Sequence, residues 1–264
     1  MEEETKQVPL EERFNKELVP EGAKITTIVS GGMDSVTLLF YALSRTAKEN
    51  IQVLSFNYGQ KHKKELEFAK ALCSELGVSH KVVDLTSVQD MLHSTLTSED
   101  AVPHGHYAEE NMRATVVPNR NAIMLSLAYG AGISFGSQYL LYGAHTGDHF
   151  IYPDCRPEFV EALDKAFALG NKGFGDLQIV APFGRISKSE ILTVGLEMNV
   201  PYDRTWSCYE GQERPCGQCG TCTERTEAFL DNNAKDPLMT EEEWVKAVEH
   251  HAKATAEYKA KQQV

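Results

Sequence analysis

The chain has 264 residues, which is long enough for one large α/β domain with an appendage and a sizeable core. Its hydrophobic fraction of 42% and charged fraction of 24% are typical of a soluble globular protein, and no apolar run approaches the length of a membrane span. The formal net charge of −12 weighs against a non-specific nucleic-acid binder, because phosphate contacts need a basic surface, but it allows a small anion in a local pocket.

The chain begins with a charged segment, residues 1–22, which lacks clear periodicity and is interpreted as an N-terminal extension. Its first four residues are acidic where a signal peptide would be basic, and no apolar stretch follows. We therefore expect a cytoplasmic protein. In that compartment the six cysteines are expected to be reduced or metal-bound rather than paired.

A predicted strand and a predicted helix flank a glycine-containing turn. Residues 25–29 are all β-branched and predict a buried strand, and residues 35–43 predict the start of a helix. The turn consists of Ser30, Gly31, Gly32, Met33, Asp34 and Ser35. Glycines let a ligand approach the backbone, and the N–H groups of a first helical turn favour an anion. Two glycines alone could form an ordinary turn, but S-G-G-x-D-S straight after a strand is much more specific for a phosphate or pyrophosphate.

This SGGMDS segment resembles the pyrophosphate loop of the adenine-nucleotide α-hydrolases, the PP-loop ATP pyrophosphatases. It differs from a Walker A loop, because no G-x-x-x-x-G-K-[ST] occurs in the chain. The resemblance implies a loop that holds the β- and γ-phosphates of ATP as a leaving group while a substrate attacks the α-phosphorus. The implied products are an adenylylated substrate and then AMP and pyrophosphate.

Strands and helices alternate along the chain to about residue 200. The further predicted strands are residues 51–56, 81–85, 138–143 and 177–180, and the further predicted helices are residues 61–76, 119–134, 156–169 and 188–198. This alternation predicts an α/β domain over residues 23–200, with a doubly wound, mostly parallel five-stranded sheet and helices on both faces. Ligands of such sheets bind beyond the carboxyl ends of the strands, so the loops that follow the strands are the candidates.

Several of these loops carry polar residues with two interpretations each. Gln60 and His62 could bind a heterocycle or belong to a plain turn. Arg120, at the start of a helix, could make a two-pronged contact with a phosphate or carboxylate, or be a solvated surface residue. Lys188 follows a capping serine and offers a point charge. Cys155 could be a thiol near the substrate or a small buried residue, whereas Cys73 is expected in the core.

The segment 93–118 is largely polar and is interpreted as a long loop over the site. It contains Pro103 and three histidines, His93, His104 and His106, whose spacing matches no standard metal site.

Four cysteines are clustered near the C-terminal end: Cys208, Cys216, Cys219 and Cys222. Four thiolates this close together predict a closed, structural Zn²⁺ site, with an iron–sulfur cluster as the main alternative. Such a site would pin residues 201–264, interpreted as a small zinc-binding helical segment, and would not activate water. That segment ends in a charged helix that runs from an N-cap at Thr240 to about Lys261.

Together these segments resemble the 7-cyano-7-deazaguanine synthase family. The matching motifs are SGGMDS, YGQKH, VPNRN and YPDCR, a lysine after the fifth strand and the four-cysteine cluster, between about residues 24 and 230. The departures are the N-terminal extension, the C-terminal helix and residues 143–150, where the loop of the family is only partly matched.

The resemblance implies that ATP adenylylates the carboxylate of 7-carboxy-7-deazaguanine, that ammonia displaces AMP to give an amide, and that a second ATP activation gives the nitrile. It implies ATP, Mg²⁺ and Zn²⁺ as cofactors, small molecules as partners, and it leaves a homodimer open. The residues implied to hold pyrophosphate and Mg²⁺ are those of the SGGMDS loop. Asp34, Lys188 and Arg120 are the catalytic candidates, and the substrate-binding candidates are Tyr58, Gln60, Tyr152, Asp154 and Arg156.

Three alternatives belong to other classes. A tRNA-modifying PP-loop enzyme, such as a thiolation enzyme or lysidine synthetase, is disfavoured by the acidic charge and the lack of an evident RNA-binding domain. A PP-loop enzyme that attaches a deazapurine to a macromolecule would use the same adenylate. A non-catalytic zinc- and nucleotide-binding module is disfavoured by the intact SGGMDS motif.

Overall fold

The computed structural model describes residues 8–60, 63–91, 94–97, 104–108, 110–210 and 212–262. Its centre is a five-stranded sheet of order β3-β2-β1-β4-β5, in which all neighbouring strands are parallel. The strands are β1 (Ile25–Ile28), β2 (Ile51–Asn57), β3 (Ser79–Asp84), β4 (Tyr139–Leu141) and β5 (Gln178–Val180). The predicted doubly wound, parallel five-stranded sheet is confirmed.

Eight α-helices and six short 3₁₀ helices surround the sheet in the described ranges of the chain. The α-helices are α2 (Leu10–Arg13), α3 (Met33–Arg45), α4 (Lys64–Leu76), α5 (Arg120–Phe135), α6 (Pro157–Gly170), α7 (Lys188–Glu197), α8 (Gly220–Asp231) and α9 (Glu241–Lys261). The 3₁₀ helices are η1 (Lys48–Asn50), η2 (Thr86–Met91), η3 (Glu110–Thr115), η4 (Thr146–Phe150), η5 (Pro153–Cys155) and η6 (Tyr202–Arg204).

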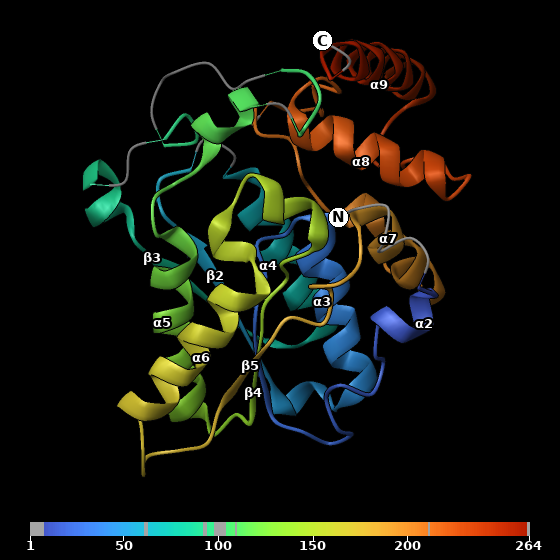
Figure 1. Cartoon of the computed structure of the whole chain (residues 1–264). Helices are drawn as coiled ribbons and strands as arrows, with labels where there is room; N and C mark the ends of the chain where they lie inside the picture. The colour runs from blue at the N-terminus through green and yellow to red at the C-terminus, as the bar shows by residue number, and fades with distance from the viewer. Residues whose placement is uncertain are drawn as a thin grey trace.

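The two faces of the sheet each have a hydrophobic core, because successive strand residues point to opposite faces. In β2, Val53 belongs to the core under α3, α4 and α7, and the next residue, Leu54, belongs to the core under α5 and α6. Figure 1 shows α5 and α6 on one side of β4 and β5, with α3 and α7 on the other. The predicted covering of both faces by helices is therefore confirmed.

Two helices begin with reciprocal side-chain caps. Ser187 and Glu190 form a capping box at α7, and Thr240 and Glu243 form one at α9, so both predicted N-caps are confirmed. The cap at α7 fixes the position of Lys188, the first residue of that helix.

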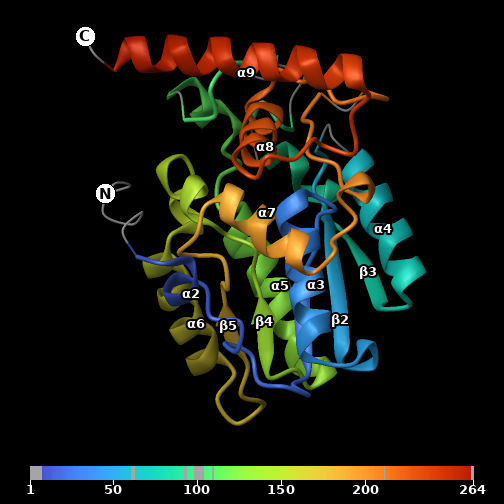
Figure 2. The same cartoon turned by 90° about the vertical axis from the view of Figure 1, so that its right-hand side faces the viewer.

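The terminal segments pack onto this domain. Phe14 and Val19 are fully buried in the core that α3 and α7 cover, and Arg13 pairs with Glu190 at the start of α7. At the other end of the chain, α9 lies across one end of the molecule, above α8 (Figure 2). Tyr258 of α9 stacks on His106 with ring centroids 4.2 Å apart. None of the described helices combines the length and the apolar character needed to cross a lipid bilayer.

Candidate active site

A cavity of about 260 Å³ opens beyond the carboxyl ends of the central strands, where an open parallel sheet places its ligands. Its walls include the SGGMDS loop after β1, Tyr58 after β2 and the segment from Gly143 to Asp148 after β4. Tyr107, Met112 and Thr115 also line it, so the segment predicted to lie over the site does so in its described part. His93 and Pro103 lie outside the described residues.

The SGGMDS loop turns sharply between β1 and α3. Gly31 has a φ of 102°, and a Cβ there would lie 2.0 Å from the carbonyl oxygen of Glu65, so only glycine fits this position. The backbone N–H groups of Ser30 and Gly31 both donate to Oγ of Ser35, at 3.1 and 3.3 Å. Gly32 is the N-cap of α3 and supplies no side-chain cap. The first-turn N–H groups therefore remain available for an anion, as the sequence predicted for this strand–helix turn.

Charged side chains from three helices meet beside this loop. Nζ of Lys188 lies 3.3 Å from Oδ2 of Asp34 and donates a hydrogen bond to Oε2 of Glu224, which belongs to α8. Burial alone would lower the pKa of Lys188, but the carboxylates of Asp34, Glu224 and Asp148 outweigh it and raise that pKa. The lysine is thus held as an ammonium ion at the wall of the cavity.

His145 completes this charged group and was missed in the sequence, as were Asp148 and Glu224. Its Nδ1 accepts a hydrogen bond from the N–H of Gly147 at 3.1 Å, which leaves the ring proton on Nε2. That atom faces carboxylate oxygens of Asp34, Asp148 and Glu224 at 3.8, 3.5 and 3.9 Å. The departure of residues 143–150 from the loop of the resembled family was the signal that could have drawn attention to His145 and Asp148.

Arg120 lies in an aromatic part of the same cavity. Its Nη1 donates to the hydroxyl of Tyr58 at 3.3 Å, and its guanidinium lies 5.6 Å and 6.0 Å from the ring centroids of Tyr58 and Tyr152. Among the described residues, Nε of Arg120 is buried without a hydrogen-bond partner. A buried donor of this kind suits a carboxylate or a phosphate oxygen. The hydroxyl of Tyr152 is fixed by Oγ1 of Thr115 at 2.6 Å.

Three predicted substrate residues do not line the cavity. The side-chain amide of Gln60 is buried and bonds the backbone of Tyr58 and Phe56. Asp154 accepts from the N–H of Asn121, and Arg156 donates to the carbonyl of His149. These side chains support loops that border the cavity, and a direct contact with substrate stays a prediction for them. Lys61 and His62 of the YGQKH motif lie outside the described residues.

Cys155 lines the cavity from below Tyr142, whose hydroxyl lies 3.4 Å from its Sγ. Asn121 donates to the same sulfur at 3.4 Å. Burial raises the pKa of the Cys155 thiol well above its ordinary value, and the nearby Asp148 raises it further. The geometry therefore favours a small packing residue over an activated nucleophile. Cys73 is fully buried in the core, as predicted.

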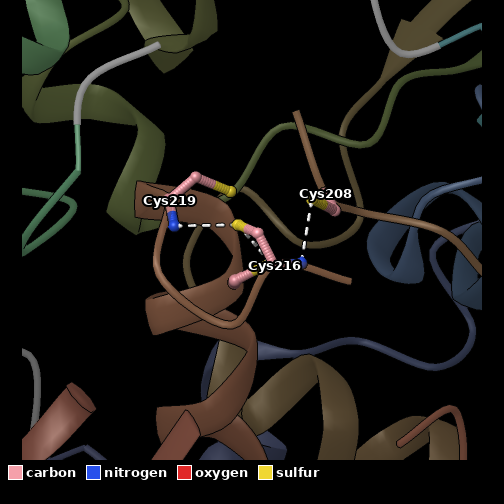
Figure 3. Close-up of side chains that lie close together, drawn as sticks. Cys208, Cys216 and Cys219 are labelled. Atoms are coloured by element: carbon pink, nitrogen blue, oxygen red, sulfur yellow. Dashed lines mark hydrogen bonds between the residues drawn. The ribbon is translucent and has the colours of Figure 1, made fainter. Parts of the chain in front are cut away.

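The four clustered cysteines come together beside α8 and form a group that could hold a metal ion (Figure 3). Their sulfur atoms all lie within 4.8 Å of one another. The backbone N–H groups of Gln218 and Cys219 donate to Sγ of Cys216 at 3.4 and 3.3 Å, as they would to a thiolate. A tetrahedral ion with metal–sulfur bonds of about 2.3 Å needs sulfurs about 3.8 Å apart, so this group fits such an ion.

The chain has close relatives of known name. A family model described as queuosine biosynthesis protein QueC matches residues 24–233. A 7-cyano-7-deazaguanine synthase from Pseudoalteromonas atlantica is 52% identical over 221 residues, covering 83% of this chain and 99% of that protein. One from Archaeoglobus fulgidus is 46% identical over 239 residues, covering 90% of this chain and 99% of that protein.

The parallel sheet, the SGGMDS loop at the end of β1 and the charged cavity beside it define an enzyme of the PP-loop class. Within that class, the match over most of the chain identifies the family. This chain belongs to the QueC family of queuosine biosynthesis proteins.

Proposed function

We propose that this protein uses ATP to convert 7-carboxy-7-deazaguanine and ammonia to 7-cyano-7-deazaguanine. The observation that carries the proposal is the identity of 52% to a protein named for that product, over 99% of the length of that relative. The cavity supports the proposal chemically. It combines an anion-binding loop with a buried, partly unpaired arginine, and a PP-loop enzyme that activates a carboxylate needs both.

The reaction balances in two similar halves. A carboxylate oxygen attacks the α-phosphorus of ATP and releases pyrophosphate, and ammonia then displaces AMP to give the amide. The amide oxygen attacks a second ATP in the same way, and loss of AMP and protons leaves the nitrile. A carboxylate or amide oxygen leaves readily only after such activation, so each half consumes one ATP.

The residues of this chain divide these tasks. The loop from Ser30 to Ser35 holds the two terminal phosphates, and Lys188 neutralises charge on them. Arg120 orients the carboxylate that reacts. Asp34 fits a Mg²⁺ site, because its Oδ1 is buried without a hydrogen-bond partner among the described residues and can supply the oxygen that this cation prefers. When bound, Mg²⁺ would offset the negative charge of the phosphates.

The clustered cysteines are proposed to bind Zn²⁺, which prefers four thiolates in a structural site. Elemental analysis should find about one zinc per chain, and Cys222→Ser should lose it. The matched control is Cys73→Ala, which removes a buried cysteine of the core and should keep the metal. Iron with visible charge-transfer absorbance, in protein purified without oxygen, would contradict a zinc site.

The bond that breaks in ATP tests the function itself. With oxygen-18 in the substrate carboxylate, label from both oxygens should appear in AMP, and mass spectrometry should detect the nitrile. The amide supplied as substrate should also give nitrile and should still need ATP. Label in inorganic phosphate, with ADP as product, would mean that the loop serves γ-phosphoryl transfer and would overturn the proposal.

The other expectations from the sequence remain proposals. We infer a cytoplasmic enzyme that acts on small molecules rather than nucleic acid, in line with the net charge of −12. We also infer a catalytic domain over residues 23–200 that follows an extension over residues 1–22, and a metal-binding segment over residues 201–264. A homodimer stays a prediction, which sedimentation of the purified protein can test.

A further inference from the structure

Glu224 reaches the cavity from the cysteine-rich segment, which the sequence assigned a purely structural part. Its carboxylate accepts a hydrogen bond from Nζ of Lys188, and both side chains line the cavity beside the SGGMDS loop. The two side chains are only 12% and 11% exposed, so the contact is shielded from water and from screening by salt.

An ammonium group has three N–H donors and no acceptor. In Lys188, Glu224 and Asp34 approach from α8 and α3 and can take two of these donors, at the bonded contact and at 3.3 Å. The third donor is left for the cavity that the pyrophosphate loop lines. The position of Glu224 therefore decides where the free donor of Lys188 points.

Glu224 itself has little freedom to move. It lies two residues after Cys222 of the metal-ligand group and one before Arg225, whose guanidinium makes two hydrogen bonds to Asp236. A Cβ on Gly147 would lie 2.9 Å from Oε1 of Glu224, so this side of the carboxylate is closely packed as well.

Helices α7 and α8 are also bonded directly, which keeps Lys188 and Glu224 in register. Oγ of Ser189 donates to Asp231 at 2.6 Å, and Oγ1 of Thr193 donates to Oδ1 of Asn232 at 2.7 Å. The metal-binding segment and the phosphate-binding lysine are thus parts of one rigid arrangement.

We propose that Glu224 is the positioning residue of Lys188, aiming its ammonium group at the terminal phosphates of the nucleotide. This inference rests on the proposed function, and it gives the cysteine-rich segment a role in the reaction. A carboxylate at this place has two opposing effects. It holds the lysine for the transition state, and it also repels the incoming polyphosphate.

Glu224→Gln tests the inference because it keeps the shape of the side chain and removes its charge. The value of kcat should fall by about 10- to 100-fold, since small misplacements of a catalytic group have effects of that order. The KM for ATP and the Kd for magnesium pyrophosphate, measured by calorimetry, should stay equal or decrease. Glu224→Asp keeps the charge but withdraws it by one methylene, and it should also lower kcat.

The matched control is Asp231→Asn, the same chemical change on the same helix, at a contact with α7 outside the cavity. It should leave kcat unchanged. Weaker pyrophosphate binding, loss of metal or full activity in either Glu224 variant would overturn the inference. Crystals of wild type and Glu224→Gln with magnesium pyrophosphate separate it from the proposed function. Nζ of Lys188 should bridge Glu224 and a phosphate in the wild type and shift in the variant, whether or not the carboxylate substrate is turned over.

Discussion

Asp34→Asn should lower ATP-dependent turnover by about 10²- to 10³-fold, the size of effect seen when one preorganised electrostatic group is removed from an active site. Asp34 is placed to act on the Mg²⁺ pyrophosphate group, because it stands at the start of α3, lines the cavity and contacts Lys188. The change keeps the volume of the side chain, which is 22% exposed, so the fold should be retained.

The measurement is initial-rate kinetics at several fixed Mg²⁺ concentrations, with the melting temperature as a test of folding. Asp176→Asn is the control, because Asp176 is exposed on a loop and does not line the cavity. Wild-type turnover in the Asp34 variant under metal-controlled conditions would remove this carboxylate from the reaction.

The largest effect on stability is expected at Arg225. Its guanidinium donates to both carboxylate oxygens of Asp236 at 2.6 and 2.8 Å, and also to Thr205 and to the carbonyl of Tyr202. Both charged side chains are buried, at 2% and 0% exposure. Arg225→Met leaves a buried carboxylate without its partner and should lower the free energy of unfolding by about 3–5 kcal/mol.

Urea denaturation of the metal-loaded protein measures this change. The double variant Arg225→Met, Asp236→Leu should recover most of the loss, because no buried charge is then left unpaired. A single variant that loses less than about 1 kcal/mol would show that the buried carboxylate finds other partners or takes up a proton.

The sequence predicted the sheet and its helices well because their signals are local. Residues 25–29 and 51–56 are short β-branched or apolar runs between helical patterns, and both form central strands. Alternation of strands and helices then restricts the topology to a parallel sheet, and the rule for ligand sites locates the cavity. The loop SGGMDS and the four-cysteine group were visible for the same reason, since their chemistry lies in consecutive or closely spaced residues.

What the sequence did not give depends on contacts between distant segments. Helix α8 was not predicted as a separate element, because its buried face carries Thr223, Arg225 and Thr226 instead of an apolar stripe. Glu224 meets Lys188 across 36 residues, and no spacing rule links the two. His145 meets Asp34 only through tertiary packing. Polar networks between elements cannot be read from periodicity, which reports burial of apolar residues.

The contact between Tyr258 and His106 has a consequence for how much of the chain makes a complete enzyme. His106 is stacked between Tyr258 and Tyr107, with ring centroids 4.2 and 4.5 Å away, and Tyr107 lines the cavity. The part shared with the QueC family ends at residue 233, well before Tyr258. In this protein, a segment outside the shared part therefore braces the wall of the cavity. Shortening the chain to the shared part would keep the PP-loop but remove the brace, and a bulky fusion near the C-terminus would be felt at the substrate.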